Sequence, residues 1–146
     1  MGNLKLTSSA FEDGGEIPRK CGYKNGNKEP PLTVSGIPER TKSLALIMDD
    51  PDAMGAVGKV WVHWLAWNID PTATENLQDA TEGMKDFGEV GYGGPAPPDK
   101  RHTYVFKLYA LDCELDLSNE STKADVEKAM EGHIIEQTQL TGTYAP

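Results

Sequence analysis

The sequence predicts a single, mainly β domain that spans residues 1–146. Two observations support this class. Apolar runs of strand length alternate with turn clusters, and the chain contains 15 glycines and 10 prolines, a pattern that favours strands and tight turns over a helical bundle. A length of 146 residues is typical of one domain with one hydrophobic core.

The clearest strand signals lie between residues 43 and 70. An apolar run over 44–48 ends in an acidic loop at Asp50, and a second run, aromatic and β-branched, begins at Val60. Alternate residues share one face of a strand, so one face of the second run is expected to carry Trp61, His63, Leu65, Trp67 and Ile69. Antiparallel pairing of the two runs would place Asp50 beside His63 at one end of the sheet.

Another long strand is expected over 102–112, directly after a loop rich in glycine and proline at 91–98. His102 and Tyr104 begin this strand on the face that also carries Phe106 and Leu108. The polar pair therefore lies at the loop end of the strand.

The remaining elements are shorter. The pattern favours a strand over 4–11, a loop-rich flank over 12–38 with short strands near Ile17 and 32–34, and a crossover over 71–88 with one helical turn. Thr122 and Asp125 resemble a capping box, and Gly132 suits the end of a helix, so the one helix is expected at about 122–131. Residues 134–144 are expected to form an edge strand or an extended tail.

The charge balance narrows the classes of partner. The chain has 14 Lys and Arg residues and 23 Asp and Glu residues, which gives a net charge of −9. The long-range field therefore repels nucleic acid and anionic membrane surfaces. Lys59, Lys100 and Arg101 lie in loops where they would attract a small anion at short range. No apolar stretch approaches the ~20 residues of a membrane span and no signal peptide is evident, so we expect a cytoplasmic chain, with Cys21 and Cys113 as free thiols.

Four groups are predicted to converge at one end of the sheet: Asp50, His63, His102 and Tyr104. Backbone N–H groups of the glycine loop would complete a cradle suited to an anion such as phosphate. Three alternatives stay open. The histidines could be packed core residues, Asp52 could join Asp50 and the histidines as metal ligands, or a His and Asp pair could serve a hydrolase, although no nucleophile lies in these loops. No cofactor is expected.

Four ordered motifs resemble the phosphatidylethanolamine-binding protein family, in its short prokaryotic branch. They are D-P-D-A at 50–53, aromatic-x-His-Trp at 61–64, G-P-x-P-P at 94–98 and H-x-Y at 102–104. The resemblance implies a large antiparallel sheet packed with a smaller one, and a pocket for phosphate-like anions. Carried over by position, the pocket would be lined by Asp50, Trp61, His63, Gly94, His102 and Tyr104.

The resemblance also carries functional expectations and departures. It implies a non-enzymatic protein that binds a phospholipid head group, a nucleotide or a phosphorylated side chain, and that forms a homodimer by analogy. The alternative is a regulator that acts through a protein surface, as a serine-protease inhibitor or kinase modulator. The family commonly has proline, arginine and cysteine where this chain has Met54, Thr103 and Ala96.

Overall fold

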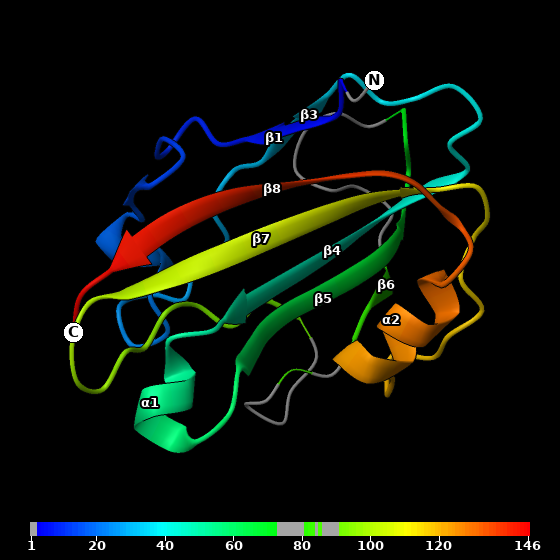
Figure 1. Cartoon of the computed structure of the whole chain (residues 1–146). Helices are drawn as coiled ribbons and strands as arrows, with labels where there is room; N and C mark the ends of the chain where they lie inside the picture. The colour runs from blue at the N-terminus through cyan, green and yellow to red at the C-terminus, as the bar shows by residue number, and fades with distance from the viewer. Residues whose placement is uncertain (1–2, 73–80, 84, 86–90) are drawn as a thin grey trace.

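The structure is a computed structural model that describes residues 3–72, 81–83, 85 and 91–146, apart from the side chain of residue 56. Figure 1 shows the order of its elements. They are β1 (Lys5–Thr7), β2 (Gly15–Glu16), the 3-10 turn η1 (Arg19–Cys21), β3 (Thr33–Ser35), β4 (Ser43–Asp50), α1 (Ala53–Val57), β5 (Trp61–Ile69), β6 (Thr81–Glu82), β7 (His102–Leu111), α2 (Lys123–Met130) and β8 (Ile134–Tyr144).

The described strands form two sheets, as the family resemblance implies. The large sheet has the order β2-β8-β7-β4-β5-β6, and the small one pairs β1 with β3. All pairings are antiparallel except that of β2 with β8. The four long strands β8, β7, β4 and β5 run side by side through the middle of the molecule (Figure 1).

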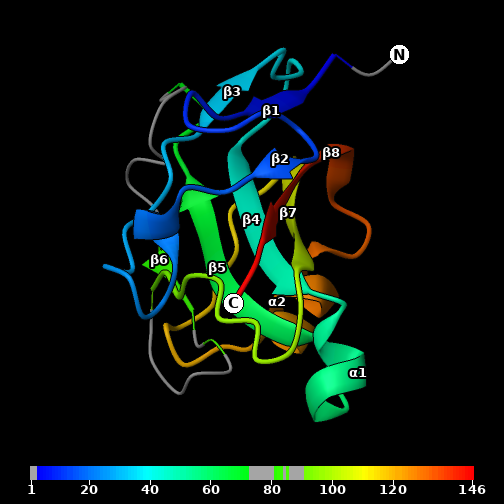
Figure 2. The ribbon, with the colours of Figure 1, turned by 90° about the vertical axis from the view of Figure 1, so that its left-hand side faces the viewer.

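Different parts of the chain cover the two faces of the large sheet (Figure 2). The small sheet contributes Leu6 and Val34 to one core cluster, which includes Phe106 and Leu108 of β7 as predicted. The other cluster forms where α2 packs against the opposite face. Each buried side chain of this size contributes about 1.5–3 kcal/mol, so both faces stabilise the sheet.

Strand β4 lies at the centre of the sheet, and all eight of its residues are buried. Its last two residues are charged and point to opposite faces, because neighbouring strand residues alternate. Asp49 pairs with Lys107 at 3.2 Å and with Lys123 of α2 at 2.9 Å. Asp50 is therefore directed to the other face, where the predicted site lies.

The predicted alternation along β5 is wrong in part, because the strand contains bulges. Met48 pairs with Trp64 but Asp49 pairs with Val62, so His63 is the extra residue of a bulge. A second irregularity follows further along the strand. Each bulge reverses the face of the residues that follow it, so Leu65 and Trp67 pack on the α2 side whereas Ile69 packs on the opposite side.

Several element boundaries also differ from the prediction. The first strand covers only Lys5–Thr7, and β8 lies between β2 and β7 rather than at an edge. The helix at Lys123–Met130 is confirmed, with the capping box of Thr122 and Asp125 formed. Most of the crossover over 71–88 falls outside the described residues, and its described part contains β6.

Two further properties of the described chain bear on the predictions. Cys21 and Cys113 are both free thiols, as expected. Among the helices in the described ranges, none combines the length and apolar character that a bilayer crossing requires.

Candidate functional site

A hollow of about 230 Å³ lies at the end of the sheet where β4 ends and β5 and β7 begin. Four of the six predicted site residues line it, namely Asp50, Trp61, His63 and His102. The rest of the lining comes from α1 and from the glycine and proline loop: Ala53, Val57, Ala96 and Pro98. We call this hollow the histidine pocket.

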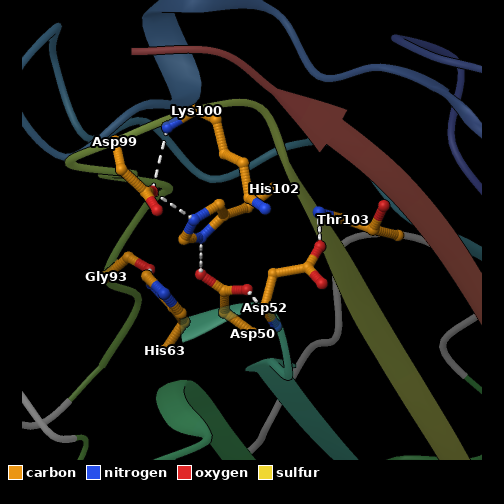
Figure 3. Close-up of polar contacts among 8 residues, drawn as sticks. All are labelled: Asp50, Asp52, His63, Gly93, Asp99, Lys100, His102 and Thr103. Atoms are coloured by element: carbon orange, nitrogen blue, oxygen red, sulfur yellow. Dashed lines mark hydrogen bonds and ion pairs between the residues drawn. The ribbon is translucent and has the colours of Figure 1, made fainter. Parts of the chain in front are cut away.

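His102 is held between two carboxylates (Figure 3). Its Nδ1 lies 2.6 Å from Oδ2 of Asp50, and its Nε2 lies 2.7 Å from Oδ1 of Asp99. Burial alone lowers the pKa of His102, but the hydrogen bonds to Asp50 and Asp99 and their negative charges outweigh it, so the pKa is raised. With both ring nitrogens facing acceptors, the imidazolium form donates to both.

Asp50 and Asp52 join three elements around His102. The second oxygen of Asp50 accepts a hydrogen bond from the Asp52 N–H at 3.0 Å. The Asp52 carboxylate in turn accepts from the Thr103 N–H at 2.8 Å (Figure 3). The end of β4, the start of α1 and the start of β7 are thus tied together, which fixes the position of the imidazole.

His63 is oriented by the glycine loop rather than by a carboxylate. Its Nδ1 donates to the Gly93 carbonyl at 2.8 Å, and the Gly93 N–H donates back to the His63 carbonyl at 2.8 Å. Burial lowers the pKa of His63, and this effect exceeds the raising effects of the Gly93 carbonyl and of Asp50. The two pocket histidines therefore differ, His102 favouring the charged form and His63 the neutral form.

Tyr104 packs against both imidazoles but does not line the hollow. Its ring meets that of His63 edge-on at 5.2 Å between centroids, and lies 6.3 Å from that of His102. The side chain is fully buried, and its hydroxyl has no hydrogen-bond partner at ordinary distance and angle among the described residues. Burial, and then the charge of Asp50, raise the pKa of this hydroxyl, so it stays protonated.

Gly94 has a packing role in this structure. Its N–H donates to Oδ1 of Asn27 at 2.7 Å instead of pointing at the pocket. A Cβ at this position would lie 1.9 Å from the Cys21 carbonyl oxygen. Only glycine lets the loop approach the turn at 19–23 this closely.

Of the three basic residues predicted to attract an anion from the loops, not all lie beside the pocket. Lys59 lies beside the pocket, with its Nζ 5.6 Å from the centroid of the Trp61 ring. Arg101 points elsewhere, because its guanidinium donates to Glu16 of β2 at 2.8 Å. Lys100 is exposed, and its backbone N–H donates to Asp99.

One residue of the site, Asp99, was missed by the sequence analysis, and another, Asp52, was considered only as a metal ligand. Asp99 lies three residues before His102 and contacts its Nε2, and a carboxylate so close to a site histidine was the available signal. Asp52 directly precedes α1, a helix in a segment predicted to be a loop. The signals for that helix were an aspartate at the N-cap position, Asp52, and a glycine at its end, Gly58.

The donor atoms that suit a metal ion gather at the other end of β7. In the described ranges, one group has its donor atoms within 4.8 Å of one another: Asp112, Cys113 and His133. The predicted alternative of Asp50, Asp52, His63 and His102 does not form such a group.

A second hollow of about 310 Å³ shares Ala96 and Pro98 with the histidine pocket. Its charged lining residues are Arg19 and Lys24. Arg19 stacks on the Tyr144 ring at 4.3 Å and donates to a backbone carbonyl at 2.7 Å. We therefore take the histidine pocket, which holds the buried titratable groups, as the candidate site.

Comparison with known proteins shows the family to which this chain is related. The model of the family described as phosphatidylethanolamine-binding protein matches residues 7–145. A solved phosphatidylethanolamine-binding protein homologue from Chlamydia trachomatis shares 38% identity with this chain at a TM-score of 0.91, and covers 99% of this chain and 98% of its own. Escherichia coli YbcL, described as a member of the mammalian family, shares 32% identity at a TM-score of 0.89, with 98% of each chain covered.

Relatives of similar length support the same assignment. A UPF0098 protein of Methanothermobacter thermautotrophicus is 45% identical, over 97% of this chain and 98% of its own. A UPF0098 protein of Chlamydia muridarum is 42% identical, over 97% and 98%. The chain therefore belongs to the phosphatidylethanolamine-binding protein family.

Proposed function

We propose that the protein binds a small molecule bearing a phosphate-like group in the histidine pocket, and that it acts as a binding protein rather than an enzyme. The observation that carries the proposal is that two buried imidazoles from different strands, His63 and His102, line one hollow of about 230 Å³. A hollow of this size suits a small head group better than a whole lipid or peptide.

The electrostatics of the pocket support an anionic ligand. The raised pKa of His102 keeps a positive charge in a buried position, and hydrogen bonds from a charged donor to an oxyanion are about twice as strong as neutral ones. Asp50 fixes the ring from its Nδ1 side, so the donor direction is set before a ligand arrives. Pre-organisation of this kind lowers the entropic cost of binding.

The apolar part of the lining supports an ester rather than a bare ion. Ala53, Val57 and Trp61 contribute apolar surface to the hollow, and an organic substituent on the phosphate would cover this surface. The chemistry shared by a phospholipid head group, a nucleotide and a phosphorylated side chain is a phosphate ester. The family description names phosphatidylethanolamine, which makes phosphoethanolamine the first ester to test.

The lining also supports binding over covalent catalysis. Among the described residues that line the pocket, none is a serine, threonine or cysteine. A hydrolase with a His and Asp pair needs such a nucleophile, or a positioned water, beside the base.

Isothermal titration calorimetry tests the proposal. Inorganic phosphate, phosphoethanolamine and phosphoserine are titrated into the wild type and into His63→Gln, His102→Gln and His133→Gln, where His133 provides a matched control far from the pocket. We expect both pocket variants to lose binding and the control to keep it. Tighter binding of phosphoethanolamine than of phosphate would identify an ester head group, and unchanged binding in both pocket variants would reject the proposal.

A further inference from the structure

We infer that Asp99 is an internal stand-in for the ligand: its carboxylate occupies the oxyanion position at His102 and must leave before a phosphate-like anion binds. The inference rests on the proposed function and adds a residue that sets the affinity of the site. None of the sequence motifs includes Asp99, which follows G-P-x-P-P directly.

The geometry at Asp99 is that of an occupied oxyanion site. Its Oδ1 lies 2.7 Å from Nε2 of His102 and accepts the Lys100 backbone N–H at 2.9 Å. One oxygen thus meets a ring N–H and a backbone N–H, as Figure 3 shows. Two converging donors of this kind, one on a cationic ring, form the cradle that a phosphate oxygen would use.

Of the two carboxylates on His102, Asp99 is the one that can be released. The side chain of Asp50 is 4% exposed and that of Asp99 is 45% exposed. Asp50 is also tied to the Asp52 N–H, whereas the described contacts of Asp99 are with His102 and its own neighbour Lys100. Water can solvate Asp99 as soon as it swings outward, so the contact costs little to break.

The charges around His102 also require that Asp99 be displaced when an anion binds. The groups around the His102 ring are Asp50 of β4, Asp99 of the loop, His63 of β5 and the phenol of Tyr104. Two carboxylates against one imidazolium leave a net negative cluster. An anion that approached with Asp99 in place would meet like charge, whereas an anion that replaces Asp99 keeps the imidazolium paired on both sides.

The test compares phosphate affinity in Asp99→Asn, Asp116→Asn and the wild type. Asparagine keeps the size of the side chain but removes the charge. Asp116 is an exposed aspartate after β7, at the far end of the strand from His102, and its substitution removes the same charge from the protein. We expect inorganic phosphate to bind about two- to fivefold more tightly to Asp99→Asn, the range that loss of a partly exposed competing charge gives, and to bind Asp116→Asn like the wild type.

A second readout separates displacement from a general gain in affinity. Loss of one of its two carboxylates lowers the pKa of His102, so the pH above which phosphate binding is lost should move down in Asp99→Asn and stay in place in Asp116→Asn. If the wild type binds phosphate and Asp99→Asn binds no more tightly than Asp116→Asn, the stand-in role is overturned while the proposed function stands. If neither the wild type nor any variant binds phosphate or phosphoethanolamine, the proposed function is rejected, and this inference is rejected with it.

Discussion

Substitution of Asp50 by asparagine should destabilise the protein through His102. The Asp50 carboxylate accepts from His102 Nδ1 at 2.6 Å and from the Asp52 N–H at 3.0 Å, and it is buried. Asparagine has one acceptor oxygen in place of two, so one donor loses its partner. A lost hydrogen bond to a charged group costs about 1.5–3 kcal/mol of unfolding free energy, which lowers the melting temperature of a domain this size by about 5–10 °C.

The effect should depend on pH in a defined direction. The folded-state pKa of His102 is raised, so the stability from its charged form is fully present below the unfolded pKa and is lost as the pH rises through the folded pKa. The difference in stability between the wild type and Asp50→Asn should therefore be largest in mildly acidic solution and shrink at alkaline pH.

Chemical denaturation of the wild type, Asp50→Asn and the control Asp116→Asn at several pH values measures this difference. The control removes the same charge from an exposed site. Equal stability of the two variants near pH 6 would refute the reasoning, because the buried ion pair would then contribute nothing that a surface carboxylate does not.

Three further predictions concern the loop, the neutral histidine and the helix. Gly94→Ala should lose at least about 1–3 kcal/mol of stability, because its Cβ collides with backbone. Gly55→Ala in α1 has open space and should gain about 0.5–1 kcal/mol; equal effects in denaturation would contradict this. His63→Phe should lose about 1 kcal/mol of stability, because the hydrogen bond to Gly93 is removed. The pKa of His63 is lowered in the folded state, so its neutral form gives stability that is lost as the pH falls, and the variant should lose less stability in acid than the wild type. The same loss of stability in acid in both proteins would contradict this. Thr122→Ala should cost about 0.5–2 kcal/mol by removing the cap of α2, and an unaltered midpoint would exclude that role.

The sequence was sufficient to predict the central hairpin and the end of the sheet at which the polar groups meet. Short-range patterns in the sequence show that β4 ends at acidic residues and that β5 begins near a histidine. Antiparallel pairing of the two strands then brings Asp50 and His63 to one pocket. The face of Tyr104, Phe106 and Leu108 followed from strict alternation along β7, which contains no bulge in this part.

The errors have physical causes that no local pattern reveals. A bulge at His63 depends on how β5 pairs with β4, and pairing is a long-range property. Gly94 was expected at the pocket because glycine permits a close approach, but the partner it approaches is the turn at Cys21. Asp99 was predicted only as part of the glycine and proline loop, since its short spacing from His102 does not by itself show that its carboxylate turns back onto the imidazole.

The most direct test of the account is an NMR titration of histidine ring nitrogens with phosphoethanolamine. The chain has three histidines, two in the pocket and His133 at the opposite end of β7. The account predicts that His102 is protonated at both ring nitrogens near neutral pH, and that the ligand shifts the signals of His102 and His63 while leaving that of His133 in place. A ligand that shifts none of them, or His133 alone, would contradict it.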